Sequence, residues 1–431
     1  MICDNLGVNH KGHLTFCSLD TVALAEKYGT PLYLLDEDKI REKCRIYVNS
    51  IKKHFGESSM PLYAGKALCI KDIYRIMREE GMGIDVVSGG EIYTASVGGF
   101  PMEKAYFHGN NKTDCDIAFA MEKGVGYFVC DSETELEAIE KEAAKRGIIQ
   151  KVLLRITPGI DPHTHQAINT GRVDSKFGAA IETGQAKALV ALALKQPHLA
   201  LMGYHCHIGS QIFETEPFTD AAEIMLDFSA EIKDAFGYEA EIINLGGGMG
   251  VPYLPEHPQI DYEANIAVIA EKMKSVCKTR GLKMPSVRME PGRSIVADGG
   301  MTLYSAGTLK IIPGFKSYVS VDGGMPDNPR FALYGSPYSV AVANRMNEKK
   351  DFLCTVAGRC CESGDIIQED VLMPKPERGD VIAVMTTGAY NYSMASNYNR
   401  IPRPPVVMIK DGEDKLIIRR ETYEDMLACE L

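Results

Sequence analysis

Short apolar runs alternate with amphipathic segments along residues 31–290. Eight of these runs are rich in β-branched and aromatic residues, which is typical of buried strands. They are PLYAGKA (61–67), GIDVVS (83–88), AYFHGN (105–110), GYFVCD (126–131), KVLLRI (151–156), LMGYHCHIG (201–209), EIINLGGG (241–248) and SVRMEPG (286–292). This alternation predicts parallel strands joined by helices. Eight repeats in this length predict a (β/α)8 barrel, with a doubly wound open sheet as the alternative.

The segments between the runs show helical periodicity and clear end signals. One apolar face is predicted for the segment 38–55, formed by Ile40, Cys44, Val48, Ile51 and Phe55. Ser132 and Glu135 predict a capping box, and Gly147 predicts the end of the helix that follows. The segment that begins at residue 262 is predicted to end at Gly281 in the same way. We therefore expect amphipathic helices around the barrel.

The pattern changes after Pro291. The remaining sequence has strand-like runs and glycine turns but few long helical patterns, and Asp411–Gly412 predicts a hairpin. We expect a barrel domain over residues 31–292 and a mostly β domain over 293–431. A strand from residues 1–30 is expected to join the β domain.

Composition narrows the class of protein. The chain has 431 residues, of which 45% are hydrophobic and 24% charged, as in soluble globular proteins. Its net charge is −11 and no basic stripe is present, which argues against nucleic-acid binding. No apolar run is long enough to span a membrane. Twelve cysteines without CxxC spacing or an export signal predict reduced thiols in a cytoplasm.

Polar residues follow the predicted strands, where a barrel carries its active site. They are Lys66, Asp85, Ser88, His108, Asn110, Asp131, Arg155, His207, Ser210, Gly246–Gly248 and Glu290. No His/Cys/Asp cluster has metal-ligand spacing, and HTHQ (163–166) is isolated, so we expect no metal.

Several of these residues have both a purely structural interpretation and a chemical one. Lys66 is either a snorkelling lysine or a nucleophilic amine that forms a Schiff base. The glycines after the seventh run are either an ordinary turn or a phosphate cradle. Glu290 and Arg293 form either a surface ion pair or a site for a pyridine nitrogen and a phosphate or carboxylate. His207 is either a core residue or a ring that lies against a planar cofactor. The chemical interpretations together fit pyridoxal 5'-phosphate.

A set of motifs then resembles a known family. YAGKA, DVVSGGE, HGNNK, TH followed by SKFG, HIGSQ, GGG, EPGR, RFALYG, CES and GAY occur in the order found in diaminopimelate decarboxylases. These are alanine-racemase-like, barrel-type enzymes that depend on pyridoxal phosphate. The resemblance extends from about residue 20 to about residue 410.

The resemblance implies residue roles. Lys66 resembles the lysine that carries the cofactor, Glu290 the partner of its ring nitrogen, and His207 the histidine that stacks on its ring. The cofactor shell is implied to be Lys66, His207, Ser210, Gly246, Gly247, Gly248, Glu290, Pro291, Gly292, Arg293 and Tyr390. The substrate residues are implied to be Arg293, Arg330, Tyr334, Glu362 and Tyr390. Cys361 resembles the family's proton donor, whereas Cys360 receives no role.

The resemblance also implies an activity and an assembly. The expected reaction converts meso-2,6-diaminopimelate to L-lysine and carbon dioxide, in a homodimer whose cysteine loop reaches the neighbouring subunit's site. The alternatives are a related decarboxylase acting on another amino acid or a carboxylated polyamine precursor, a racemase, and a non-catalytic cofactor carrier. Arg359, Phe331 and Ile401 stand where the family usually has proline, proline and arginine. These departures bear on substrate geometry rather than on cofactor chemistry.

Overall fold

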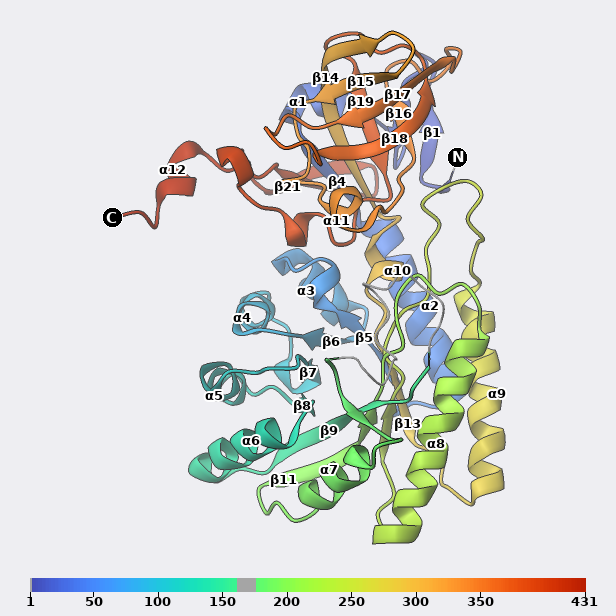
Figure 1. Ribbon diagram of the computed structural model, residues 1–431, viewed down its shortest axis with the longest axis vertical. Coiled ribbons are helices and arrows are strands. Elements are labelled where there is room, and N and C mark those ends of the chain that lie inside the picture. The colour runs from blue at the N-terminus through green and yellow to red at the C-terminus, as the bar shows by residue number, and fades with distance from the viewer. Residues whose placement is uncertain (1, 161–175) are drawn as a thin grey trace. The chain divides into compact units, whose positions relative to one another are not determined.

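The computed structural model describes residues 2–160 and 176–431, so the HTHQ segment lies outside the described residues. The described chain divides into two compact units. Unit 1 comprises Met1–Glu42, Val251–Gln259 and Ile295–Leu431, and unit 2 comprises Lys43–Gly250 and Ile260–Ser294. Each unit has its own sheet system (Figure 1).

Unit 2 is a closed barrel of eight parallel strands. The strands are β5 (Met60–Ala64), β6 (Gly83–Val86), β7 (Ala105–Phe107), β8 (Tyr127–Cys130), β9 (Gln150–Thr157), β11 (Leu199–His205), β12 (Ile242–Asn244) and β13 (Ser286–Met289). Closure is set by the pairing of β13 with β5 and of β8 with β9, and the short β10 (Ala179–Ala180) adds to β9. The predicted (β/α)8 barrel is therefore confirmed, and the open sheet is excluded.

Helices follow the strands and lie outside them (Figure 1). They are α2 (Glu37–Phe55), α3 (Lys71–Glu79), α4 (Gly89–Val97), α5 (Asp114–Glu122), α6 (Glu133–Arg146), α7 (Gln185–Ala193), α8 (Glu216–Phe236) and α9 (Tyr262–Arg280), with the short turns η1 (Gly65–Ala67) and η2 (Met102–Lys104). Both α6 and α9 end at glycines in the left-handed conformation, Gly147 and Gly281, as predicted.

The capping box predicted for α6 is only half formed. The Ser132 hydroxyl accepts a hydrogen bond from the backbone N–H of Glu135, as a cap should. The Glu135 carboxylate, however, accepts from the N–H of Asp131 and forms a buried ion pair with Lys112. The prediction of a reciprocal box was therefore wrong, because a buried lysine attracts the carboxylate that would have completed it.

Unit 1 is built around a mostly antiparallel sheet. Its strands are β4 (Leu32–Asp36), β14 (Gly300–Ile312), β15 (Lys316–Val321), β16 (Val340–Val342), β17 (Phe352–Ala357), β18 (Ile366–Met373), β19 (Val381–Met385), β20 (Val406–Lys410) and β21 (Glu413–Ile418). The short helices are α1 (Thr21–Tyr28), α10 (Arg293–Val296), α11 (Arg330–Tyr334), η4 (Tyr392–Met394), η5 (Tyr398–Arg400) and α12 (Tyr423–Leu427). The β character expected after Pro291 is evident here.

Segments from the N-terminal and C-terminal parts of the chain both contribute strands to unit 1. The hairpin of β20 and β21 turns at Asp411 and Gly412, both with positive φ, as the sequence predicts. β4 pairs with β14 and β20, so this apolar run belongs to the β sheet rather than to the barrel. Residues 1–30 instead form a separate three-stranded sheet of β1 (Leu6–Val8), β2 (Leu14–Phe16) and β3 (Leu19–Asp20). Leu14 and Phe16 of β2 pack in the core of unit 1.

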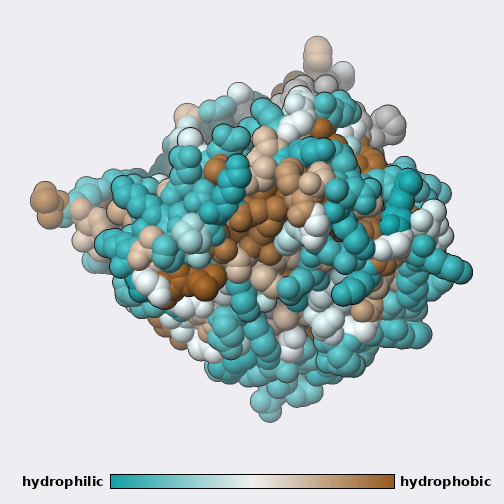
Figure 2. All heavy atoms as spheres, turned by 90° about the horizontal axis from the view of Figure 1, so that it is seen from below, coloured by the Kyte–Doolittle hydropathy of each residue, from teal (hydrophilic) through white to brown (hydrophobic). Residues whose placement is uncertain are grey.

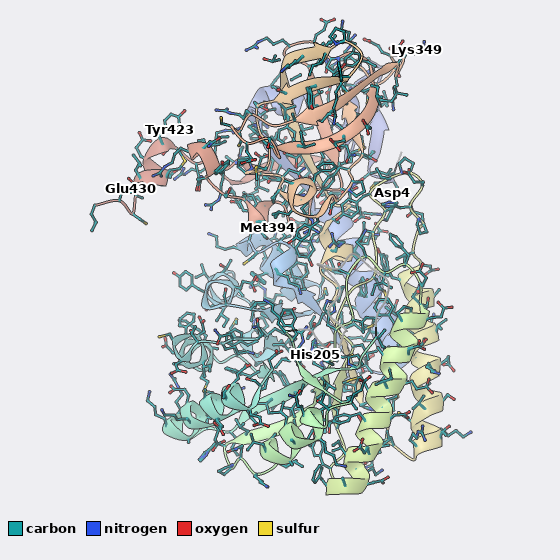
Figure 3. All side chains as sticks on the ribbon, viewed as in Figure 1. Asp4, His205, Lys349, Met394, Tyr423 and Glu430 are labelled. Atoms are coloured by element: carbon teal, nitrogen blue, oxygen red, sulfur yellow. The ribbon has the colours of Figure 1, made fainter. Side chains whose placement is uncertain are left out.

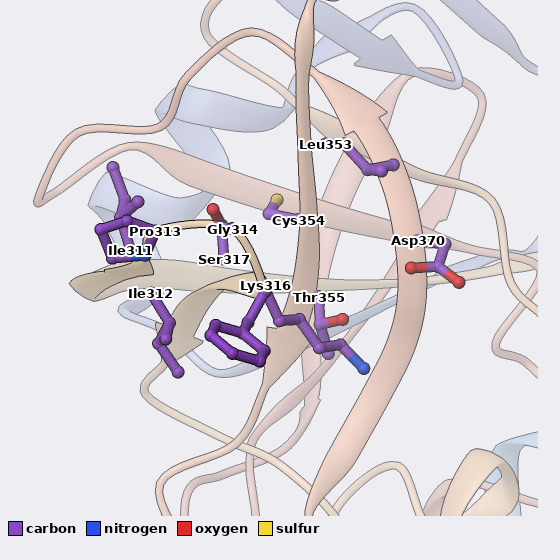
Figure 4. A pocket seen from close by; sticks show the side chains of 11 residues that line it. Ile311, Ile312, Pro313, Gly314, Lys316, Ser317, Leu353, Cys354, Thr355 and Asp370 are labelled. Atoms are coloured by element: carbon purple, nitrogen blue, oxygen red, sulfur yellow. The ribbon is translucent and has the colours of Figure 1, made fainter.

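The surface carries two further features. Figure 2 shows a largely polar face with apolar side chains gathered near its middle, a proportion that is ordinary for a folded protein. A groove beside the β14–β15 hairpin is lined by Ile311, Phe315, Leu353 and Asp370, among others (Figure 4). Among the helices of the described chain, none has the length and apolar character to cross a membrane.

Candidate active site at the barrel strand ends

The segment that carries Lys66 begins where β5 ends. Lys66 lies in η1 and is exposed, whereas its neighbours Gly65 and Ala67 are buried. The residues after β13 pack on this segment, because the Ala64 N–H donates to the Pro291 carbonyl at 3.1 Å. A Cβ atom on Gly292 would lie 2.9 Å from that of Ala64, so only glycine allows this approach. Close packing of the backbone therefore accounts for Pro291 and Gly292 at these positions, without any contact to a ligand.

Glu290 is the most constrained side chain at the strand ends. It is 7% exposed and lies directly after β13. Asn244 Nδ2 lies 2.6 Å from Oε1, His108 Nε2 lies 2.8 Å from Oε1, and His205 Nε2 lies 3.2 Å from Oε2. His205 lies among the barrel strands in Figure 3. Residues from three other strand ends therefore converge on this carboxylate.

These contacts keep Glu290 ionised. Burial opposes the charged form, but His108 and His205 outweigh burial and hold the pKa of Glu290 well below its usual value. Burial lowers the pKa of His205 to about 4, so its ring is neutral at neutral pH and donates one N–H to Glu290. The result is a buried anion surrounded by hydrogen-bond donors, which is what a protonated ring nitrogen requires as a partner.

His207 lies two residues beyond the end of β11 and carries an uncharged ring. Burial, together with the positive charges of Lys66 and Arg155, holds its pKa well below the usual value for histidine. Asp85 is buried nearby, and burial raises its pKa despite the opposing effects of His108 and Lys66. A neutral imidazole is suited to lying against a planar ring, because its face carries no charge that must be solvated.

The glycine segment 246–248 is shaped by close backbone packing. Gly246 and Gly248 have φ values of 68° and 123°. A Cβ atom on Gly247 or Gly248 would overlap the carbonyl of Glu290 or of Gly209. Nearby, both Nε and Nη2 of Arg293 donate to the Ser210 hydroxyl, at 3.3 and 3.1 Å. The paired arginine and serine, next to backbone that approaches closely, fit the chemistry of a phosphate.

These residues match the needs of pyridoxal phosphate. The site offers an accessible amine at Lys66, an ionised carboxylate at Glu290, a neutral ring at His207 and an arginine–serine pair for phosphate. Within the described residues, His108, His205 and Glu290 also offer ligand atoms within 4.8 Å of one another, as a metal site would. The polar contacts of both rings with Glu290 account for this closeness, because each histidine already directs Nε2 at the carboxylate.

The predicted substrate residues other than Arg293 belong to unit 1, and Arg330 contacts two of them. Arg330 is 5% exposed, with its guanidinium carbon 4.5 Å from the ring centre of Tyr334 and 5.1 Å from that of Tyr390. Among the described residues, no carboxylate lies within ion-pair distance of Arg330, and its Nε has no hydrogen-bond partner. A buried guanidinium in this state is costly unless a ligand supplies an anion.

The cysteine pair lies in the loop between β17 and β18. Cys361 and Glu362 are exposed, whereas Cys360 is partly buried. The Cys361 N–H donates to Asn399 Oδ1 at 2.8 Å, and Glu362 accepts from the N–H of Gly364 in its own loop. Arg359, preceding the pair, is exposed and directs its guanidinium toward the Asp322 carbonyl at 3.5 Å.

The other departures from the family pattern also have places in unit 1. Phe331 is half-buried in α11, and Ile401 is 7% exposed. The arginines on either side of Ile401 are engaged elsewhere, since Arg400 pairs with Glu430 and Arg403 with Glu421. Neither neighbour therefore offers a free guanidinium in place of the arginine that the family usually has.

Two residues of the barrel site were not predicted to act there. His205 and Asn244 both fix Glu290, and both end barrel strands. His108 was predicted only as one polar strand end among many. The signal for His205 was its place in HCHIG, two residues before His207, which in a strand puts both side chains on the same face. Asn244 precedes the glycine segment and also accepts a hydrogen bond from Gly246 N–H, so it couples that turn to the carboxylate.

Comparison with known families defines the class of this barrel. Two family profiles match, one for the pyridoxal binding domain of pyridoxal-dependent decarboxylases over residues 37–297 and one for their C-terminal sheet domain over residues 264–388. Together they span both units. The class is therefore that of pyridoxal-dependent decarboxylases, which are lyases, and the cofactor is pyridoxal 5'-phosphate.

Individual relatives narrow the class to one family. The chain is 44% identical to a diaminopimelate decarboxylase of Bacillus subtilis over 98% of its own length and 96% of the relative's. It is 43% identical to one of Staphylococcus aureus, covering 97% and 98%. A solved diaminopimelate decarboxylase of M. jannaschii, in complex with L-lysine, has a TM-score of 0.92 at 35% identity, covering 99% and 98%. The chain belongs to the diaminopimelate decarboxylase family.

Proposed function

We propose that this protein decarboxylates meso-2,6-diaminopimelate to L-lysine and carbon dioxide, the last step of lysine biosynthesis. The observation that carries the proposal is Glu290, a buried carboxylate held ionised by His108, His205 and Asn244. A permanent anion opposite the ring nitrogen favours loss of carbon dioxide, because it stabilises the electrons that remain. The lysine complex of the M. jannaschii relative supports the product.

The barrel residues hold and orient the cofactor in this proposal. Bound pyridoxal phosphate supplies the electron sink for the pair left behind when the carboxylate departs. Lys66 anchors it, Glu290 holds the proton on its ring nitrogen, and His207 supports one face of its ring. Gly246–Gly248, Ser210 and Gly292–Arg293 hold its phosphate, in line with the donor pair at Ser210 and Arg293. Pro291 shapes the turn between Glu290 and this phosphate site, and Tyr390 contacts cofactor and substrate.

The remaining residues act on the substrate. Arg330 and Arg293 bind its distal carboxylate, Tyr334 contacts the same end, and Glu362 pairs with its distal ammonium. The buried guanidinium of Arg330, without a carboxylate partner among the described residues, supports a substrate that has a second carboxylate. Ornithine has no such group. Cys361 holds a proton on Sγ and delivers it to the α-carbon after carbon dioxide leaves.

The test is a substrate panel with chiral analysis of the product. We expect carbon dioxide release from meso-diaminopimelate to exceed release from ornithine, arginine and lysine by at least about 100-fold in kcat/KM, since these substrates leave Arg330 unpaired. The product is expected to be L-lysine. Faster release from any other substrate would overturn the assignment. Appearance of stereoisomers without carbon dioxide would indicate a racemase instead.

We also propose a cytoplasmic homodimer in which each site is completed by the cysteine loop of the second subunit. The exposure of Cys361 and Glu362 supports a loop that is available to another chain. Lys66→Ala and Cys361→Ala chains, each inactive alone, are mixed and allowed to exchange subunits. Sharing predicts recovery of roughly a quarter of wild-type activity, because half of the dimers are mixed and each has one intact site. No recovery, with exchange verified by mass, would place both residues of one site in the same chain.

A further inference from the structure

The buried carboxylate of Asp365 closes the loop that carries the cysteine pair. Asp365 is 3% exposed and accepts hydrogen bonds from the N–H of Cys360 at 2.7 Å and of Met325 at 2.6 Å. Its backbone also participates, since Gly358 N–H donates to the Asp365 carbonyl and Asp365 N–H donates to the Glu362 carbonyl. The loop is thus fixed at both ends by a single residue.

Two glycines make the space for this carboxylate. A Cβ atom on Gly358 or on Gly324 would overlap the carboxylate of Asp365. Gly324 also has a φ of 149°, a conformation that side chains rarely adopt, whereas Gly358 is not among the residues with positive φ. An alanine at residue 358 would therefore act by displacing the carboxylate rather than by straining the backbone.

The adjacent thiols differ because of this arrangement. Burial and the charge of Asp365 raise the pKa of the Cys360 thiol to about 12, so this thiol is a poor nucleophile. Cys361 is exposed, and its N–H is held by Asn399 Oδ1. Because Cys360 is held by Asp365, the side chain of Cys361 is the one left accessible.

The same carboxylate ties the cysteine loop to the segment before Arg330. Met325 N–H donates to Asp365, and the preceding Gly324 N–H donates to Asp327 at 3.1 Å. The Asn328 N–H returns to the Gly324 carbonyl at 2.8 Å, just before α11 begins at Arg330. Asp365 therefore links two segments that both carry predicted substrate residues.

We propose that Asp365 is a positioning residue that sets the register of the cysteine pair, so that Cys361 rather than Cys360 is presented for proton transfer. Its action is indirect, through the hydrogen bonds that it makes with the loop backbone. The proposal rests on the proposed function in one respect, namely that Cys361 is the proton donor. The control of thiol accessibility stands independently of that role.

The first test compares the two thiols in the cofactor-loaded enzyme. Wild type is treated with iodoacetamide, and alkylation of each cysteine is followed by peptide mass spectrometry. We expect Cys361 to react at least about tenfold faster than Cys360, because the thiolate is the reactive form. In Asp365→Asn this ratio is expected to fall toward one. Asp351→Asn, an exposed aspartate near the start of β17, is the matched control and keeps the ratio. A ratio that persists in Asp365→Asn overturns the proposal.

The second test asks whether the register of the cysteine pair affects the turnover of the enzyme. Asp365→Asn and Gly358→Ala are both expected to lower kcat by roughly 100-fold, as a misplaced general acid does. Thermal unfolding of each variant verifies that it folds, and Gly358→Ala provides the test if Asp365→Asn does not. Loss of thiol selectivity with unchanged kcat in a folded variant overturns the link to catalysis.

Two cysteine variants separate this proposal from the proposed function. Cys361→Ala is expected to keep the cofactor absorbance and lose turnover, whereas Cys360→Ala keeps both. Full turnover in Cys361→Ala would remove its role as proton donor, while the alkylation ratio would still decide whether Asp365 controls the register.

Discussion

Two glutamates with proposed roles, one at the ring nitrogen of the cofactor and one at the distal ammonium of the substrate, have contrasting surroundings. Glu290, in unit 2, is 7% exposed and bound by side chains from three other strand ends. Glu362, in unit 1, is exposed, and among the described residues its carboxylate contacts only Ser363 and Gly364 of its own loop. The same functional group is therefore preorganised in one unit and free to adapt in the other.

The difference matches what each position must do. Charge that develops in a transition state is stabilised best by groups that are already oriented and shielded from water. Recognition of a flexible substrate end needs a group that can be solvated before binding and paired afterwards. We therefore expect substitutions at Glu290 to affect kcat and those at Glu362 to affect KM.

Paired Glu→Gln substitutions give the largest expected effect. Glu290→Gln removes the buried anion while keeping its size, and we expect kcat to fall by about 10²–10³-fold, the range for one electrostatic group at a reacting centre. Glu362→Gln is expected to raise KM by roughly tenfold with kcat nearly unchanged, because an exposed ion pair contributes little beyond binding. Steady-state kinetics on meso-diaminopimelate measures both.

Glu37→Gln serves as a control for burial. Glu37 is 4% exposed and paired with Arg41 in α2, so its loss costs stability without touching the proposed chemistry. The contrast fails if Glu290→Gln lowers kcat by less than about fivefold, or if Glu362→Gln lowers kcat as much as Glu290→Gln does.

The barrel could be predicted from the periodicity of its strands, whereas the pairing of side chains could not be predicted from the sequence. The eight apolar runs map onto the eight strands because the barrel buries most of their residues, which gives each run a mainly apolar signal. β4 has the same signal but pairs with β14 and β20, and nothing in its five residues distinguishes a barrel strand from a sheet strand. The half-formed capping box shows the same limit, because the partner of Glu135 is Lys112, 23 residues away.

The candidate site shows a similar division. The placement of Lys66, His207 and Glu290 at the strand ends was predictable, because these ends converge in a barrel and the family motifs mark the three positions. His205 and Asn244 were missed because their role is to hold another side chain, and that depends on distances that no sequence spacing gives. The control of the cysteine pair by Asp365 is of the same kind, since it depends on the space left by Gly324 and Gly358.

A conservative substitution at Arg330 tests the unit 1 cluster with a smaller expected effect. Arg330→Lys keeps the charge but loses the planar group that lies over Tyr334 and Tyr390. We expect KM for diaminopimelate to rise roughly tenfold, with a kcat change under about threefold. Arg345→Lys is the control, because Arg345 pairs with Glu348 and Asp380 at the surface. A fall in kcat at unchanged KM would instead assign Arg330 to the chemical step.

The smallest expected effect concerns the pH dependence of stability in the barrel cluster. The folded-state pKa of His205 is lowered to about 4, so the unfolded chain binds this proton more tightly than the folded protein does. Stability from this residue is therefore complete above pH ~6.5 and is lost as pH falls toward 4. The lowered pKa of Glu290 acts in the same direction, further into acid. Between pH 7 and pH 5 we expect protonation linked to His205 alone to lower the free energy of unfolding by about 2 kcal/mol.

Denaturant unfolding of the cofactor-loaded enzyme at several pH values measures this slope. His205→Gln keeps a donor toward Glu290 but removes the titration, so its unfolding free energy is expected to fall less steeply between pH 7 and pH 5 than that of wild type. His10→Gln, at an exposed position of unit 1, is expected to retain the wild-type slope. Equal slopes in wild type and His205→Gln would mean that the pKa of His205 is the same in the folded and the unfolded chain. Burial would then not keep the ring neutral, and the contrast with the solvent-exposed Glu362 could not rest on a neutral donor network around Glu290.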